Sequence, residues 1–153
     1  MTHEDKELLL KELCARLPYG TIIRHEGWNY EWDDSFSTWE RVVGIDDKFV
    51  YTKVIDTKTG EEYREDSWPI STFDDKPYLR PMTSMTEEEK QELSIQSSDL
   101  VFNAAINAQQ GYNIQTCAYN VFFVDFLNKH HFDYSGLIEK GLALEAPEGM
   151  YKL

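Results

Sequence analysis

The chain has 153 residues, of which 41% are hydrophobic and 14% aromatic, which predicts one folded domain with a real core and excludes extensive disorder. The formal net charge is −13, with 11 basic and 18 acidic side chains in residues 1–80, a net of −7, and 4 and 10 in residues 81–153, a net of −6. A negative field over the whole chain repels phosphates, so direct nucleic-acid binding is disfavoured.

Neither a membrane protein nor a disulfide-stabilised protein is expected. No apolar run reaches membrane-spanning length, and the N-terminus MTHEDKELLL has the wrong charge for a secretory signal, so we expect a cytoplasmic protein without a membrane partner. Cys14 and Cys117 are too few and too far apart for a disulfide framework or a zinc finger. We interpret both as buried small apolar residues, and we expect no cofactor.

The first predicted element is a helix that begins after Thr2. Threonine is a favourable N-cap, and Glu4 and Asp5 in the first turn complement the positive end of the helix dipole. Pro18 and Gly20 end the helix. Its apolar residues return at helical spacing, namely Leu9, Leu10, Leu13, Cys14 and Leu17.

A series of short β-type runs follows, separated by turn compositions. The predicted strands cover residues 21–24, 41–45, 49–55, 61–64, 68–73 and 78–80. Strands of this length and spacing are typical of a small antiparallel barrel of the Src-homology-3 type, introduced here by a helix. An open antiparallel sheet packed on helices is the alternative. The register stays open, because adjacent aromatic residues break the alternation.

A group of helices is predicted after residue 82. Thr86 and Glu89 form a capping box, in which each side chain accepts a hydrogen bond from the other residue's amide. The helix that starts there runs into residues 94–99, another follows, and the last long helix begins at Asn113 or Thr116. The fold class is thus α+β. We divide it into a helix plus β part, a helical region and a tail, at residues 1–81, 82–149 and 150–153.

The closing segment is predicted as a helix, a tight break and a second short helix. Apolar residues on more than one side of the first helix predict burial, and the polar and cationic residues 128–131 complement its negative end, which favours an end near His131. Ser135 and Gly136 form the turn, and Gly141 closes the short helix in a left-handed conformation. A loose tail is expected from Met150 onward.

Two blocks of the sequence resemble a known family. They are KPYLRPMTSMTEEE at residues 76–89 and FLNKHHFDYSGLIEKGLALEAPE at residues 126–148. On these words the chain resembles a family of uncharacterised bacterial proteins of prophage or mobile-element origin. The resemblance covers under a quarter of the chain. It implies an origin, and it implies no activity, cofactor or catalytic residue.

Histidines beside carboxylates raise two chemical possibilities. His130, His131 and Asp133 could face a metal, but adjacent histidines point in different directions, so helix capping and packing are preferred and no metal site is predicted. His25 with Glu26, or with the acidic residues that follow, could support general acid and base catalysis. No nucleophile motif or Gly-rich phosphate loop accompanies them, so a solvated loop is preferred and no catalytic residue is predicted.

Residues 27–39 alternate large aromatic rings with carboxylates and small polar residues. Packing of these rings over the barrel is the simplest interpretation. The functional interpretation is a recognition surface, because tryptophan and tyrosine supply rigid contact area and recur at binding hot spots. A sugar-binding platform is a weaker alternative. The candidate partner-binding residues are Trp28, Tyr30, Trp32, Asp33, Asp34, Phe36 and Trp39.

The sequence therefore predicts a non-enzymatic protein-interaction module encoded by a mobile element, with an unidentified protein partner. Its β part presents the binding face and its helical part stabilises it. One alternative is an acidic inhibitor that mimics nucleic acid and occupies the basic groove of a host enzyme. The other is a small hydrolase that gathers His25 or His131 with carboxylates from elsewhere in the chain. The sequence does not specify an oligomeric state.

Overall fold

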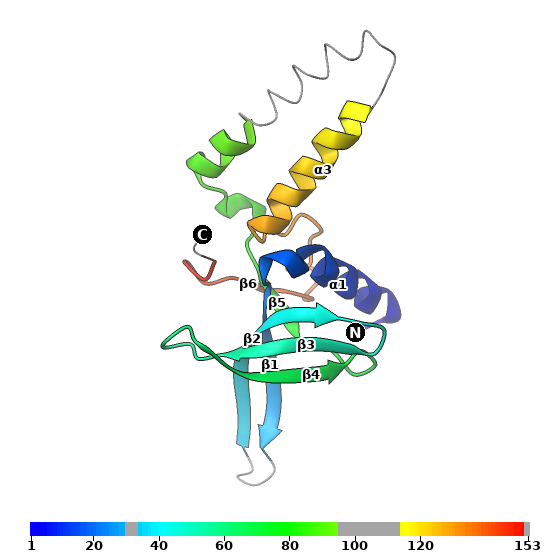
Figure 1. Cartoon of the computed structure of the whole chain (residues 1–153), viewed down its shortest axis with the longest axis vertical. Helices are drawn as coiled ribbons and strands as arrows, with labels where there is room; N and C mark the ends of the chain where they lie inside the picture. The colour runs from blue at the N-terminus through cyan, green and yellow to red at the C-terminus, as the bar shows by residue number, and fades with distance from the viewer. Residues whose placement is uncertain (30–33, 95–113, 152–153) are drawn as a thin grey trace.

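The computed structural model describes residues 1–29, 34–94 and 114–151. In this part of the chain an N-terminal helix, an open six-stranded mixed sheet and further helices form an α+β fold, which confirms the predicted class (Figure 1). The strands are β1 Ile22–Asn29, β2 Asp34–Ile45, β3 Phe49–Ile55, β4 Glu62–Pro69, β5 Lys76–Leu79 and β6 Leu144–Glu145.

The sheet is open, and the predicted barrel is wrong. Its strand order is β4-β3-β2-β1-β5-β6, so β4 and β6 form two separate edges, whereas a barrel needs its edges paired. Neighbouring strands are antiparallel except β5 and β6, which run parallel. The open-sheet alternative was therefore closer. β6 lies in the region after residue 82, which was predicted to be helical, whereas the other five strands lie before it. The sheet therefore contains strands from both predicted parts of the chain.

Two strands are much longer than their predicted runs. β1 continues to Asn29 and β2 begins at Asp34, because each residue from Ile22 to Asn29 pairs with one on β2. β4 is one strand where two short runs were expected, and the chain after Pro69 turns. Cross-strand pairing thus makes strands out of polar stretches that have little β propensity of their own.

One face of the sheet is covered by α1 His3–Arg16. The predicted cap is present, since the amide of Asp5 donates to the Thr2 hydroxyl and the Asp5 carboxylate accepts from the Thr2 amide. The core on this face consists of Leu9, Leu13, Ile23, Val42, Val50 and Phe73. Cys14 is exposed, so its predicted burial is wrong: it lies on the helix face turned away from this core.

The C-terminal chain contributes to the packing against the other face. Ile22, Ile55 and Tyr78 form a cluster there, against which Leu144 and Tyr151 pack. The Tyr151 hydroxyl accepts a hydrogen bond from the Ile22 amide at 3.0 Å and donates one to the Tyr78 carbonyl at 2.8 Å. The expectation of a loose tail is therefore wrong for Tyr151.

Helices extend from the sheet in the second half of the chain (Figure 1). A 3-10 turn, η2 Met82–Ser84, leads to a helix over residues 87–94, whose predicted Thr86–Glu89 capping box is confirmed. The last helix, α3 Ile114–Lys129, ends where the sequence predicted. Phe126 and Leu127 are buried, but Val121 is 69% exposed, because α3 projects beyond the sheet. The helical elements predicted between residues 95 and 113 lie outside the described residues.

The predicted short helix over residues 137–142 is a series of turns. The amides of Leu137 and Ile138 donate to the Asp133 carboxylate, both at 2.8 Å. Gly136 and Gly141 both adopt φ of +69°, a left-handed conformation that reverses the chain at each end of the segment. Within the described ranges, no helix has the length and apolar character needed to span a membrane.

Candidate functional site

A two-stranded arm extends from the sheet. The ladder of β3 on β2 ends at Trp39↔Ile55, and that of β5 on β1 ends at Arg24↔Lys76. Residues 25–29 of β1 and 34–38 of β2, which we call the arm, therefore pair with each other and with no other described strand. Figure 1 shows the described residues of the arm projecting past the rest of the sheet.

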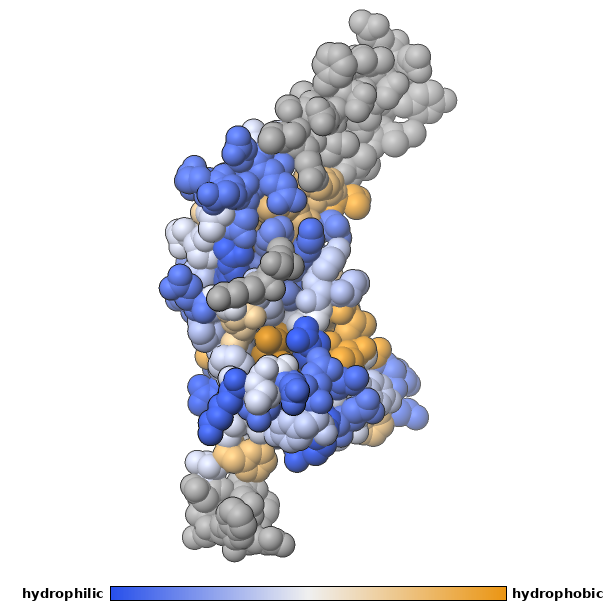
Figure 2. Space-filling model, turned by 60° about the vertical axis from the view of Figure 1, so that its left-hand side comes forward, coloured by the Kyte–Doolittle hydropathy of each residue, from blue (hydrophilic) through white to orange (hydrophobic). Residues whose placement is uncertain are grey.

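Phe36 is the aromatic residue of the arm whose surroundings are described. It lies opposite Gly27, and a Cβ atom at Gly27 would come within 2.4 Å of the Phe36 ring. The glycine thus makes room for the ring across the two strands. Phe36 remains 40% exposed. Figure 2 shows a pale orange, moderately apolar area at the lower end of the described residues, in addition to stronger apolar areas on the body of the molecule.

A histidine–aspartate pair anchors the root of the arm. His25 Nδ1 lies 3.0 and 3.1 Å from the two carboxylate oxygens of Asp75. The imidazole stacks on Trp68 with a centroid distance of 3.8 Å and is tilted against Phe36 at 6.1 Å. The hydrogen bond to Asp75 raises the pKa of His25, and burial raises the pKa of Asp75. His25 is thus part of an ordered network, and the predicted solvated loop is wrong.

A buried carboxylate extends this network across the sheet. Glu40 is 0% exposed, and its oxygens accept from the Thr52 hydroxyl at 2.6 Å, the Trp68 indole N–H at 2.8 Å and the Thr38 hydroxyl at 2.9 Å. Three donors compensate the lost hydration of the carboxylate. We call this set the polar cluster: His25, Thr38, Glu40, Thr52, Trp68 and Asp75. It connects the arm to β3, to β4 and to the segment before β5.

Sequence reasoning missed most of the polar cluster. Period-2 alternation along β1 and β2 places His25, Thr38 and Glu40 on the same face as the core residues Ile23 and Val42, which is a signal that was available. Trp68 comes from β4 and Asp75 from the segment before β5, and their meeting with His25 depends on the tertiary structure.

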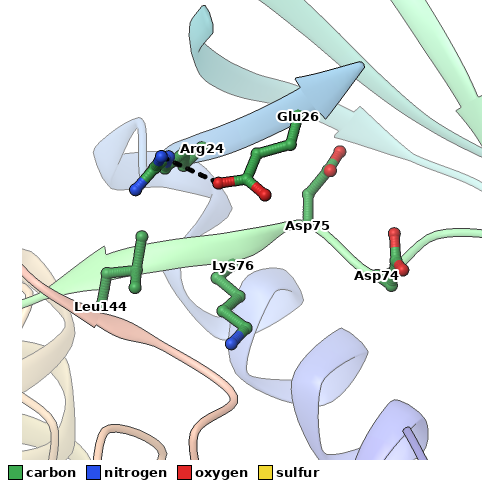
Figure 3. Close-up of a pocket in the computed structure, with 6 residues that line it drawn as sticks. All are labelled: Arg24, Glu26, Asp74, Asp75, Lys76 and Leu144. Atoms are coloured by element: carbon green, nitrogen blue, oxygen red, sulfur yellow. Dashed lines mark ion pairs between the residues drawn. The ribbon is translucent and has the colours of Figure 1, made fainter. Parts of the chain in front are cut away.

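A cavity of about 330 Å³ opens where β1 and β5 separate (Figure 3). An ion pair spans its β1 side, with Arg24 Nη2 at 2.9 Å from Glu26 Oε1. Asp75 faces the cavity from the opposite side, next to the exposed Asp74. The lining residues are Arg24, Glu26, Asp74, Asp75, Lys76 and Leu144. The cavity thus has charged groups of both signs.

The predicted partner-binding residues fall into three groups. Trp28 and Asp34 occupy strand positions in the arm, opposite Ser35 and Asn29 respectively, and Phe36 is exposed there. Trp39 is half-buried and packs against Tyr78 with a centroid distance of 5.5 Å, so it supports the fold. The remaining candidates lie outside the described residues, namely Tyr30, Trp32 and Asp33.

The histidines after α3 point to separate partners. His130 Nδ1 lies 3.1 Å from Glu89 Oε1, whereas His131 stacks on Tyr151 at 3.6 Å. The third candidate ligand, Asp133, accepts backbone amides. Across residues 1–29, 34–94 and 114–151, no group of three or more His, Cys, Asp or Glu side chains is arranged to hold a metal.

His131 does not supply a cation to the helix end. Burial lowers its pKa to about 3, so the imidazole is neutral at physiological pH, and the predicted cationic role is wrong for this residue. Its φ of +58° instead makes it the left-handed residue that ends α3.

Glu89 joins three segments of the helical region. Arg80 donates to both Glu89 oxygens at 2.6 and 2.9 Å, the Thr86 amide donates at 2.8 Å, and His130 lies against the same carboxylate. These contacts lower the pKa of Glu89 to about 2, chiefly through the Arg80 hydrogen bonds. The arrangement holds the helix over residues 87–94 to the sheet.

No family model, curated protein or solved structure matches this chain. The arm, the polar cluster and the adjoining cavity are therefore interpreted from their own geometry.

Proposed function

We propose that this chain is a cytoplasmic, non-enzymatic protein-interaction module that binds a protein partner with its arm. The observation that carries the proposal is the extension of the arm past every other described strand, with Phe36 exposed on it. His25 and Thr38 tie the root of the arm to the polar cluster, but no other described strand pairs with the arm, so the exposed Phe36 is available to a partner. Exposed aromatic rings on a projecting element are typical of binding hot spots.

The polar cluster supports this proposal because it keeps the arm ordered before binding. An isolated two-stranded ribbon is only marginally stable in water. Here the root of the arm is hydrogen-bonded through His25 to Asp75 and through Thr38 to Glu40. A pre-ordered arm loses less conformational entropy on binding, and the affinity rises accordingly.

The resemblance of residues 76–89 and 126–148 to prophage and mobile-element proteins supports an origin in such an element. With that origin, we propose a host protein as the partner. The net charge of −13 favours a basic one. In the alternative of acidic mimicry, this chain occupies the basic groove with which the partner binds nucleic acid.

The test is partner capture with matched single variants. Two arm variants are used: Phe36→Ala removes an exposed ring of the arm, and Trp32→Ala removes a predicted partner-binding residue from the sequence between the two arm strands. Tyr63→Ala removes a ring that is 63% exposed on β4. We expect proteins captured from host lysate, identified by mass spectrometry, to be lost with both arm variants and retained with Tyr63→Ala, at unchanged melting temperature. Retention of the same proteins by both arm variants would contradict the proposal. Capture that resists raised ionic strength would contradict acidic mimicry alone.

The His25–Asp75 pair favours a second candidate, a small hydrolase. An imidazole oriented by a carboxylate is the usual general base of hydrolytic sites, and Asp75 faces the cavity beside β1. His131 is less suited to this role, because its pKa of about 3 leaves it a weak base. Hydrolysis of ester or phosphoester substrates that disappears in His25→Gln would support this candidate.

A further inference from the structure

We propose that the arm receives its partner as an added β-strand: an extended, lysine- or arginine-rich segment pairs with the free edge of β1 beside Glu26 and Trp28. This inference rests on the proposed interaction function and names the partner's chemistry and the place where it docks.

The hydrogen-bond pattern identifies which backbone groups lie at that edge. The Val42 amide donates to the Thr21 carbonyl at 2.9 Å, which makes 21↔42 a hydrogen-bonded pair. Residues alternate along an antiparallel ladder, so odd-numbered residues of β1 bond to β2, and even-numbered residues turn their N–H and C=O groups to the other side. The Ile22 amide agrees, since it bonds to the Tyr151 hydroxyl on that side.

β5 occupies only the first part of this edge. It pairs with β1 at Ile23↔Pro77 and Arg24↔Lys76 and goes no further. Pro77, which has no N–H, stands where the ladder makes no hydrogen bond. On the N-terminal side of Lys76 the chain does not follow the edge of β1, and Phe73 lies in the core. The backbone groups of Glu26 and Trp28 therefore have no described strand beside them.

The cavity lies at this fork, as Figure 3 shows. It has Glu26 on the β1 side and Asp74 on the side that β5 has left, which are the residues that a continued ladder would bring opposite each other. An incoming strand would take the place of the missing part of β5. Strand addition of this kind gives affinity through main-chain hydrogen bonds and specificity through side-chain pockets.

Charge selects a basic segment. Three carboxylates and two cations, Arg24 and Lys76, line the cavity, so acidic groups outnumber basic ones there. Asp74 is exposed, and the Glu26 side chain is 67% exposed beside its ion pair with Arg24, so both carboxylates can be reached by cations of an incoming strand. A second copy of this chain would bring another net charge of −13 to the same edge and is repelled. Strand β4 at the opposite edge of the sheet serves as a control. It has eight residues, as β1 has, and its outward backbone N–H and C=O groups also face no described strand.

A proline placed on the edge tests the pairing. Glu26→Pro removes an N–H that points away from β2. The hydrogen bonds between β1 and β2 stay intact, because Glu26 and Ser37 form a pair without backbone hydrogen bonds between them. Ser67→Pro is the matched control on β4: the Ile70 amide donates to the Lys48 carbonyl, so Ser67 also turns its N–H outward. The probe is a synthetic peptide in which lysine alternates with valine.

We expect the peptide to bind the unmodified chain and Ser67→Pro equally, and Glu26→Pro about tenfold more weakly, from one lost hydrogen bond and the obstructing ring. N-methylation of alternate peptide amides should abolish binding to the unmodified chain, a measurement that needs no variant. Equal binding of the methylated peptide, or no binding of the unmethylated one, would overturn the inference. Concentration-dependent dimerisation that Glu26→Pro removes would assign the edge to a second copy and overturn it as well.

The two proposals can fail separately. If host proteins are lost from Phe36→Ala but fully retained by Glu26→Pro, the arm binds its partner without strand addition and this inference alone is wrong. If they are retained by Phe36→Ala and Trp32→Ala, the proposed function fails first.

Discussion

Glu89 carries the largest single electrostatic contribution among the carboxylates whose pKa is shifted. Its pKa falls from 4.5 to about 2, so its folded-state contacts stabilise the protein above pH 4.5, and that stability is lost as the pH falls toward 2. The side chain is only 14% exposed and that of Arg80 20%, so solvent screens the pair weakly.

We expect Glu89→Gln to lower the free energy of unfolding at pH 7 by about 3 kcal/mol, the equivalent of the pKa shift. The loss combines the Arg80 pairing with the cap on Thr86. Urea unfolding at pH 7 and pH 3 measures it, with the exposed Glu88→Gln as control. An equal loss in Glu88→Gln, or a difference that does not shrink at pH 3, would contradict this account.

At the scale of elements, the arm depends on the cross-strand fit between Gly27 and Phe36. A methyl group at Gly27 overlaps the far end of the ring, so the ring must move away from the strand. At Gly44, by comparison, the nearest atom lies 3.4 Å from the added Cβ, which is ordinary contact.

We expect Gly27→Ala to speed amide exchange in the arm and to cost about 1 kcal/mol, whereas Gly44→Ala leaves the arm unchanged. In a Phe36→Ala background the cost of Gly27→Ala should vanish, because the overlapping ring is gone. Hydrogen exchange and a double-mutant cycle of unfolding free energies measure both effects. A cost that persists without the ring would mean that the glycine is needed for backbone conformation.

At the scale of the whole molecule, two histidines give stability opposite dependences on pH. The raised pKa of His25 means that its contribution is complete below pH 6.5 and is lost as the pH rises through the folded-state value. The raised pKa of Asp75 acts in a lower window, because its contribution is complete below pH 3.8 and is lost as the pH rises above that value. The lowered pKa of His131 means that its contribution is complete above pH 6.5 and is lost as the pH falls toward 3.

We therefore expect the melting temperature to pass through a maximum close to the ordinary histidine pKa of 6.5. His131→Asn, in which asparagine tolerates a left-handed backbone, should reduce the slope of the unfolding free energy on the acid side by about 1 kcal/mol per pH unit, and the melting temperature should then fall less steeply there. His25→Gln should flatten the alkaline side. Thermal unfolding across the pH range checks both. Unaltered slopes in the two variants would assign the profile to the net charge instead.

What the sequence by itself determined is local. The capping boxes at Thr2 and Thr86, the end of α3 at Lys129 and the position of β3 all follow from side chains that satisfy nearby backbone groups or from short-range periodicity. The aromatic character of residues 27–39 was equally visible, because it is a matter of composition.

Only the tertiary structure decided that the sheet stays open and that Asp75 meets His25. It also decided that β6 pairs with β5, which joins Tyr78 to Leu144, 66 positions later in the chain. It also hydrogen-bonded the half-buried Tyr151 to Ile22 and Tyr78, in a segment that was expected to be loose. These outcomes bring together residues far apart in the chain. Local propensity contains no information on such meetings, because their free energy comes from desolvation and hydrogen bonds that form only after the chain has folded.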